Sequence, residues 1–237
     1  MADKKHEIVY SSERYAVMAN DVIRGKQGMG LQEAKLLRLL IAQVAKDDKD
    51  LKAYTLKISE LAEFLNIPKN NLYRDVRGIC DTLLQRVVRV GTGDPKKPWK
   101  IFQWIQLAEY DGMGKLTLML SNQIMPFVIE LDKYFTQYKL EKILEMNSYY
   151  AIRLYELLKS DEYRYPDYYE YSMEFLRQFF DCENKYPRFN NFKERVIDIS
   201  VREINEKTEF KIRKIEYIKN GRAVVGLRFY VEYLEIK

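Results

Sequence analysis

The same order of elements is expected twice along this chain: a short strand, a short helix, a tight turn, a longer helix and a β-hairpin. The strongest single signal is Asn220-Gly221 between two long extended stretches, because this dipeptide favours a two-residue hairpin turn. Alternate residues from Val225 to Tyr233 are apolar, which predicts that one face of this hairpin is buried. A hairpin of this kind needs a helical layer against its apolar face.

The segment before that hairpin has the pattern of a helix-turn-helix. Tyr168–Ser172 resembles a strand, Met173–Phe180 a short apolar helix, Asp181–Pro187 a turn and Arg188–Lys207 a long helix. The long helix has a core stripe of Phe189, Phe192, Val196 and Ile199 and, about a quarter turn away, a polar stripe of Arg188, Asn191, Arg195 and Arg202. A basic outer face on the second helix is typical of a DNA-reading helix-turn-helix.

The first half of the chain repeats this order in other letters. Tyr54–Ile58 is expected to be a strand, and Ser59 the N-cap of a short helix that ends at Asn66-Ile67-Pro68. Lys69–Gln85 follows as a helix with Leu72, Val76, Ile79 and Leu83 on one side and Asn70, Arg74 and Arg77 on the other. Extended stretches then follow at residues 87–91, 99–108 and 115–120, with turns at residues 91–95 and 111–112. Helix-turn-helix plus hairpin predicts a winged helix in each half.

The remaining segments are expected to be helical at residues 11–24, 31–46 and most of 122–159, with Ser148 as an N-cap and Gly25–Gly30 as a flexible loop. The predicted fold class is therefore α+β, with two tandem winged-helix domains. We expect residues 1–131 to form the first domain, for dimerisation and DNA contact. Residues 132–237 are expected to form the second domain, which does most of the DNA reading.

Charge distribution points to a polyanionic partner. The net charge is only +5, but residues 69–100 carry eight Lys/Arg against three Asp/Glu, and residues 182–222 carry eleven against seven. Two separate basic stretches are the pattern expected of a protein that binds nucleic acid at two places. Cytoplasmic location is expected, because the charged N-terminal residues 1–10 lack the apolar core of a signal peptide and no apolar run approaches a membrane span.

Enzymatic and cofactor-dependent functions find little support in the sequence. His6 is the only histidine, so neither a zinc site nor the histidine pair of a rolling-circle nickase is available. A Walker-type phosphate loop is absent, and Cys80 and Cys182 are interpreted as packing residues. We therefore predict a protein that is not an enzyme and that needs no metal or cofactor.

Several stretches resemble a known family. YKLEKILEMNSYYAIRLYELLK (residues 138–159), FKERVIDISVREIN (192–205) and KNGRAVVGLRFYV (219–231) are similar to the replication initiator proteins of iteron-containing plasmids, and EAKLLRLLIAQV (33–44) fits more loosely. Two departures are Ile199-Ser200, where the family often has Pro-Ala, and Asp181-Cys182, where it often has a glycine near the turn. The resemblance covers about residues 10–235.

The resemblance implies binding to repeated iterons in double-stranded origin DNA, opening of AT-rich DNA, and recruitment of the host initiator and replicative helicase. It also implies a homodimer in equilibrium with a monomer, and in many members repression of the protein's own gene. We expect the first winged helix to form much of the dimer interface, with the Gly25–Gly30 loop and the aromatic segment Trp99–Trp104 contributing. Two alternatives remain open: a winged-helix transcriptional repressor without an initiator role, and a protein–protein interaction module.

The candidate DNA-contacting residues fall into two recognition helices and two hairpins. Arginine and asparagine can pair bidentately with guanine and adenine, and lysine contacts phosphates. The predicted DNA-binding residues of the first half are Lys69, Asn70, Tyr73, Arg74, Arg77, Lys96 and Lys97, with Lys100 beside them. Those of the second half are Arg188, Asn191, Lys193, Arg195, Arg213, Lys214, Lys219 and Arg222.

Overall fold

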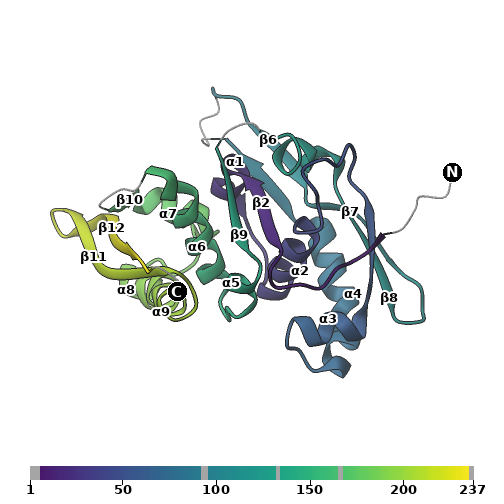
Figure 1. Cartoon of the computed structure of the whole chain (residues 1–237). Helices are drawn as coiled ribbons and strands as arrows, with labels where there is room; N and C mark the ends of the chain where they lie inside the picture. The colour runs from purple at the N-terminus through teal and green to yellow at the C-terminus, as the bar shows by residue number, and fades with distance from the viewer. Residues whose placement is uncertain (1–5, 92–95, 132–133, 165–167, 235–237) are drawn as a thin grey trace. The chain divides into compact units, whose positions relative to one another are not determined.

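The chain folds into two compact units, shown in the computed structural model of Figure 1. The structure describes residues 6–91, 96–131, 134–164 and 168–234. The first unit comprises Met1–Val22 and Met29–Leu144, and the second comprises Ile23–Gly28 and Glu145–Lys237. The boundary expected between residues 131 and 132 thus falls inside the first unit, because β9 (Phe135–Lys139) pairs with β2 (Tyr15–Ala19) of that unit.

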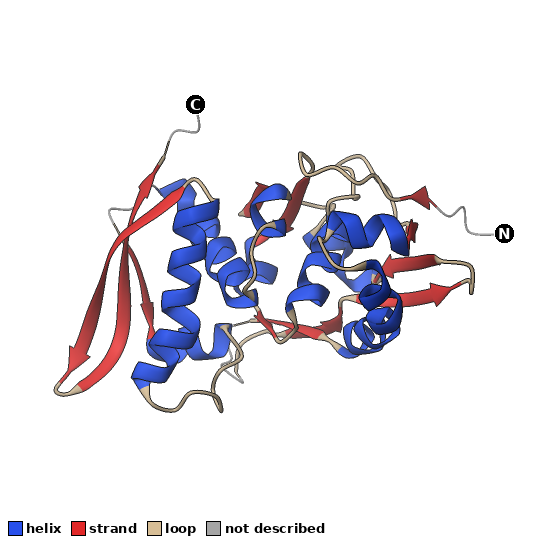
Figure 2. Cartoon of the chain, turned by 90° about the horizontal axis from the view of Figure 1, so that it is seen from below, coloured by secondary structure: helices blue, strands red, loops and turns tan. Residues whose placement is uncertain are grey.

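The first unit mixes helices with short strands (Figure 2). In chain order it contains β1 (His6–Glu7), β2, α2 (Leu31–Ile41), β4 (Ala53–Lys57), α3 (Ile58–Phe64), α4 (Lys69–Gln85), β5 (Val87–Val90), β6 (Lys100–Gln103), β7 (Ile105–Tyr110), β8 (Lys115–Leu120), the 3₁₀ helix η1 (Asn122–Phe127), β9 and α5 (Glu141–Leu144). Helix α1 (Asn20–Arg24) spans the point at which the chain passes from the first unit to the second, between Val22 and Ile23.

A four-stranded sheet in the order β1-β4-β8-β7 supports the first helix-turn-helix. Strand β4 precedes α3 and pairs antiparallel with β8, the last strand of the β7–β8 hairpin. The helices bury an apolar core against this sheet, and its fully enclosed side chains include Leu37, Leu40, Ile58, Leu61, Leu83 and Leu118. Burial of such side chains is the main force that holds these short elements together.

The second unit has fewer and longer elements. From Glu145 onward it contains α6 (Tyr149–Asp161), the 3₁₀ turn η2 (Glu162–Arg164), β10 (Tyr169–Ser172), α7 (Met173–Phe179), α8 (Phe189–Phe192), a π-helical segment η3 (Lys193–Asp198), α9 (Ile199–Lys207), β11 (Phe210–Asn220) and β12 (Ala223–Tyr233). Ser148 caps α6 as predicted, its hydroxyl accepting a hydrogen bond from Ala151 N at 3.4 Å. Phe179, Phe192, Phe210 and Phe229 are fully buried in its core.

The two units share one strand order around the helix-turn-helix. In the second unit β10, which precedes α7, pairs with β12, and β12 pairs with β11. This repeats the order β4-β8-β7 of the first unit, with the strand before the helices always next to the last strand of the hairpin. The prediction of two winged-helix domains is therefore confirmed.

Two helix predictions are wrong in part. Residues 15–19 of the expected 11–24 helix form β2, whose alternating burial fits a strand paired with β9. The stretch from 122 to 159, expected to be mostly helical, contains β9 and only short helices before α6. In both cases the pairing joins residues more than a hundred positions apart, so no local pattern signals it.

Most of the expected flexible loop at Gly25–Gly30 is instead built into the second unit, which includes residues 25–28, whereas Met29 and Gly30 belong to the first unit. Ile23 and Gln27 are fully buried. Gly25 O accepts a hydrogen bond from the buried Arg153 Nη2 at 2.8 Å, and Gln27 O accepts one from Tyr149 Oη. Lys26 Nζ lies 2.7 Å from a carboxylate oxygen of Glu183. This segment contributes to the core and surface of the second unit.

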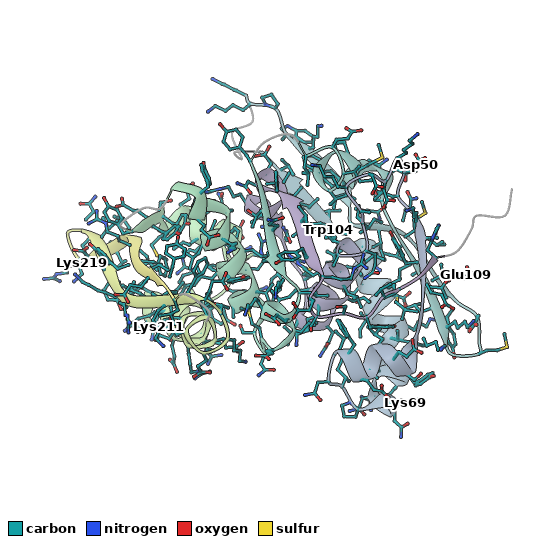
Figure 3. The ribbon with its side chains drawn as sticks, viewed as in Figure 1. Asp50, Lys69, Trp104, Glu109, Lys211 and Lys219 are labelled. Carbon is teal, nitrogen blue, oxygen red and sulfur yellow. The ribbon has the colours of Figure 1, made fainter. Side chains whose placement is uncertain are left out.

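The aromatic segment Trp99–Trp104 is only half exposed. Trp99 and Ile101 are 63% and 50% exposed, whereas Trp104 is fully buried and stacks near the Arg38 guanidinium at 5.9 Å. Figure 3 shows Trp104 within the body of the first unit. The expected exposed strand edge is therefore limited to β6.

Among the described residues, no helix has the length and apolar character needed to cross a membrane.

Candidate nucleic-acid interface

The outer face of α4 carries the residues predicted to contact nucleic acid in the first unit. Helix α3 ends at Phe64, and the chain turns at Asn66, whose φ of 53° lies in the left-handed region that asparagine tolerates. Helix α4 buries Leu72, Val76, Cys80 and Leu83. All five predicted residues of this helix are exposed: Lys69, Asn70, Tyr73, Arg74 and Arg77. Lys69 points away from the ribbon at the start of α4 (Figure 3).

Both arginines of α4 have acidic neighbours on the same helix. Arg74 Nε and Nη2 lie 2.7 and 2.9 Å from the two carboxylate oxygens of Asp75, and this hydrogen bonding lowers the pKa of the Asp75 carboxyl. Arg77 Nε lies 3.8 Å from Asp81, and its side chain is 92% exposed. Ion pairs this exposed hold their partners weakly. Phosphates or base edges can therefore compete for both guanidinium groups.

The turn of the second helix-turn-helix is organised by Arg177, a residue that the sequence analysis did not single out. Its guanidinium donates hydrogen bonds to the carbonyl oxygens of Cys182 (3.3 Å), Lys185 (3.1 Å), Tyr186 (3.0 Å) and Pro187 (3.3 Å). The same group lies 4.8 Å from the ring of Phe192. Arg177 therefore fixes the angle between α7 and the recognition helix. The only sequence feature that could have indicated this role is the presence of an arginine within a short apolar helix.

The same turn contains Asp181-Cys182, where related initiators often have a glycine. Asp181 has a φ of 53° and Tyr186 a φ of 52°. Asp181 adopts the left-handed conformation at lower cost than most residues, which explains how this chain dispenses with a glycine there. Cys182 is buried, and burial is the main reason that the pKa of its thiol is raised. Its interpretation as a packing residue agrees with this position.

The second recognition helix runs from Phe189 to Lys207 with Arg188 as its N-cap residue. Arg188, Asn191 and Arg195 are exposed, and the Arg195 guanidinium lies 5.8 Å from the ring of Tyr186. Lys193 is half-buried and bonds both carboxylate oxygens of Asp198, at 2.6 and 2.9 Å. Three of the four predicted residues on this helix are thus presented to solvent, and the fourth is engaged by a neighbouring carboxylate.

A π-helical segment in this helix changes the expected geometry. From Lys193 to Asp198 the backbone follows i→i+5 rather than i→i+4 hydrogen bonding. The basic stripe predicted from Arg188 to Arg202 assumed an ordinary α-helix. Side chains beyond the π segment are therefore rotated relative to those before it. Arg188, Asn191 and Arg195 lie before or within the segment, whereas Arg202 lies beyond it.

The β11–β12 hairpin carries four predicted basic residues in two settings. Asn220 pairs with Ala223, so the two-residue turn is Gly221-Arg222, one residue later than the sequence predicted. Lys219 and Arg222 lie at this tip and are exposed, and Figure 3 shows Lys219 projecting outward. Arg213 sits at a β-bulge and pairs with Glu232 at 2.6 Å. Lys214 Nζ lies 5.1 Å from the ring of Tyr230. The tip therefore offers two accessible positive charges, while the two residues nearer its base have partners in the hairpin.

The basic residues predicted for the first wing belong to a different hairpin. Lys96, Lys97 and Lys100 are exposed, but they lie in and beside the connection between β5 and β6. The hairpin that occupies the wing position in the sheet is β7–β8. Residues 105–120 contain Glu109, Asp111 and a single basic residue, Lys115. The first unit therefore has an extra basic hairpin inserted before its true wing.

Both halves of the chain match one family. Residues 15–159 match the family described as "Initiator Replication protein, WH1", and residues 172–231 match "Initiator Rep protein, WH2". The chain belongs to this family of replication initiators. The first match covers the first unit and continues through most of α6, which belongs to the second unit, and the second match lies within the second unit. Together they confirm the resemblance drawn from the sequence.

Individual relatives agree with this assignment. A replication initiation protein of Escherichia coli is 25% identical over 228 residues, covering 93% of this chain and 70% of the relative. The PI protein of Escherichia coli is 28% identical over 144 residues, which cover 54% of this chain and 47% of the relative. A crystal structure of the Pi initiator protein in complex with iteron DNA shares the fold, with a TM-score of 0.71 over 96% of this chain at 20% identity.

Proposed function

We propose that this replication initiator binds repeated sites in double-stranded origin DNA through both of its recognition helices. The observation that carries the proposal is that each helix exposes arginine and asparagine on its outer face: Asn70, Arg74 and Arg77 in α4, and Arg188, Asn191 and Arg195 in the second unit. Arginine pairs bidentately with guanine and asparagine with adenine in the major groove. Lys219 and Arg222 at the second hairpin tip supply phosphate contacts.

The choice of iterons as the target is supported by the family and by the related Pi initiator, whose structure was solved with iteron DNA. The identity of 20% makes that likeness one of fold. Opening of adjacent AT-rich DNA, recruitment of the host initiator and replicative helicase, and a cytoplasmic site of action complete the proposal. The buried free thiols of Cys80 and Cys182 agree with a reducing compartment.

The base-reading residues can be tested by affinity measurements. The probe is a duplex enriched from a random-sequence library by the wild-type protein. Arg188→Ala and Arg195→Ala should each weaken specific binding by about 1–3 kcal/mol, as expected when a base-reading arginine is lost. Lys139→Ala, on β9 outside both helix-turn-helix segments, is the control and should leave affinity nearly unchanged. Unchanged affinity of both arginine variants would refute the assignment of these residues.

The two rival functions give different results. A protein–protein interaction module would retain no duplex, whereas a DNA-binding protein should show affinity that falls linearly with the logarithm of salt concentration. A repressor without initiator function would bind DNA but fail to support replication of a plasmid that carries the enriched site. Replication of that plasmid, lost in the Arg188→Ala variant, would support the initiator function.

Dimerisation is also part of the proposal, with the dimer as the repressing form and the monomer as the initiating form. Ile101 on β6 and Trp99, which immediately precedes this strand, are exposed and offer apolar surface in the first unit for such an interface. A two-fold dimer should prefer an inverted repeat, and the monomer direct repeats. Sedimentation of the protein alone and on both kinds of site tests this. A monomer under every condition would refute the switch and leave DNA binding intact.

A further inference from the structure

The two wing tips differ sharply in chemistry although they occupy the same place in the fold. The tip of β11–β12 is polar and basic, with Asn220, Gly221 and Arg222. The tip of β7–β8 instead exposes Met113 (86%) and Tyr110 (50%). An exposed methionine with so little contact adds nothing to the core. Its position at the end of a wing leaves it available to a partner outside the unit.

The backbone of this tip is held in a defined conformation. Asp111 Oδ1 accepts hydrogen bonds from the backbone N–H groups of Met113 at 2.7 Å and Lys115 at 2.9 Å. Gly112 and Gly114, with φ of 76° and 97°, supply the left-handed conformations that the turn requires. Ile58 N, at the start of α3, donates to Gly114 O at 2.9 Å. The side chain of Met113 is therefore presented outward from a fixed turn.

The tip also borders the recognition helix of the same unit. A β-carbon placed on Gly114 would lie 2.9 Å from Tyr73 Oη, so the Tyr73 side chain on α4 rests directly against the turn. Figure 1 shows the tip of β7–β8 at the same end of the first unit as the turn between α3 and α4. Tyr73 is 38% exposed and lies between the Gly114 turn and the basic outer face of α4. The apolar tip is thus continuous with the proposed DNA surface.

We propose that Met113 is a wedge that inserts between base pairs in the minor groove beside the major groove read by α4. This inference rests on the proposed function. Apolar side chains inserted from the minor groove, methionine among them, unstack a base step and kink the duplex. Met113 suits this role because its side chain is long, unbranched and polarizable. The Asp111 carboxylate is engaged by the N–H groups of the turn, and the neighbouring Lys115 is exposed to meet a phosphate.

The wedge gives the first unit a task different from that of the second. The basic tip of β11–β12 adds phosphate contacts, whereas the β7–β8 tip deforms the duplex. Pyrimidine–purine steps unstack most easily, so a wedge adds sequence preference at a step that no recognition helix touches. The cost of unstacking is offset by contacts that the bent duplex makes.

The test places 2-aminopurine, which fluoresces more strongly when unstacked, at successive steps of the duplex enriched by the wild-type protein. Binding of the wild-type protein should raise fluorescence at one step flanking the half-site of α4. Met113→Ala should lose this rise while still binding the duplex, and Met113→Leu should restore it. Leu107→Ala is the matched control: Leu107 is an exposed apolar residue of the same hairpin that lies on β7 away from the turn, and its loss should leave the signal intact.

The outcomes separate the wedge from the proposed function. A wild-type protein that retains no duplex would refute the proposed function and the wedge with it. A bound duplex with the same fluorescence in wild type and Met113→Ala refutes only the wedge. If Met113→Ala also lowers self-association in sedimentation while the fluorescence rise persists, the tip is a protein contact and the wedge is wrong.

Discussion

Lys193 Nζ lies 2.6 Å from a carboxylate oxygen of Asp198, five residues further along the second recognition helix. The pair spans the π-helical segment, and its hydrogen bond is the main reason that the pKa of Lys193 is raised. Asp198 therefore competes with DNA phosphates for a lysine on the proposed DNA face. Under the proposed function, this competition would set how many phosphates the helix neutralises.

Asp198→Asn should release Lys193 to a phosphate. Each additional phosphate contact steepens the dependence of log affinity on log salt by about 0.9. Affinity at low salt should rise accordingly, and the measurement is a salt titration of binding to the enriched duplex. Asp50→Asn, which removes one negative charge outside both helix-turn-helix segments, should change neither quantity comparably. An unchanged slope in Asp198→Asn would show that Lys193 stays away from DNA.

Gly78→Ala should separate helix stability from DNA contact in the first unit. Gly78 lies on the exposed face of α4, and nothing comes within 4 Å of a β-carbon built there. The substitution should therefore stabilise the helix by about 1 kcal/mol. If the DNA backbone approaches α4 closely at Gly78, the same variant should bind the duplex more weakly. Urea denaturation and binding are both measured, and greater stability with equal affinity would place the DNA backbone away from Gly78.

More of the second winged helix than of the first could be predicted from the sequence. The β11–β12 hairpin and the capped helix after Ser148 depend on neighbouring residues, so local patterns predicted both elements. The turn itself lies one residue later than predicted, at Gly221-Arg222, because Asn220 pairs with Ala223. The pairing of β2 with β9 and the four carbonyl contacts of Arg177 depend on the folded chain, and no periodicity reports them. The first wing was misplaced because two hairpins follow α4, and only sheet pairing shows which one joins β4.

Acid should weaken the second unit through Glu209. Burial alone would raise the pKa of its carboxyl, but hydrogen bonds from Lys159 Nζ at 2.9 Å and Tyr155 Oη at 3.1 Å outweigh burial, and the net pKa is lowered. A carboxyl whose folded-state pKa is lowered stabilises the fold above its unfolded-state pKa and loses that contribution as the pH falls through the folded-state value. The stabilisation by the Glu209 carboxylate is therefore present at neutral pH and is lost in acid.

Glu209→Gln should lower the urea midpoint at neutral pH, and the difference from wild type should shrink as the pH falls below the ordinary pKa of a glutamate carboxyl. Glu206→Gln provides the control, because Glu206 is an exposed glutamate in the last turn of α9, three residues before Glu209. Its midpoint should follow the wild type across the whole pH range. Equal midpoints for wild type and Glu209→Gln at neutral pH would contradict the predicted role of the carboxylate.

A fragment of residues 145–237 should be less stable than the second unit within the whole chain, because it lacks Ile23–Gly28. That segment places the buried Ile23 in the core and gives the carbonyl of Gly25 to Arg153, while Lys26 pairs with Asp181 at 3.1 Å and with Glu183. Removing the Gly25 carbonyl lowers the stability of the fold, because the buried N–H group of Arg153 loses its acceptor and water cannot reach it to replace that acceptor. A synthetic peptide of residues 20–30 should raise the urea midpoint of the fragment in a saturable manner, and a peptide of scrambled order should not. A fragment with an unchanged midpoint in the presence of the peptide would show that the second unit folds without this segment.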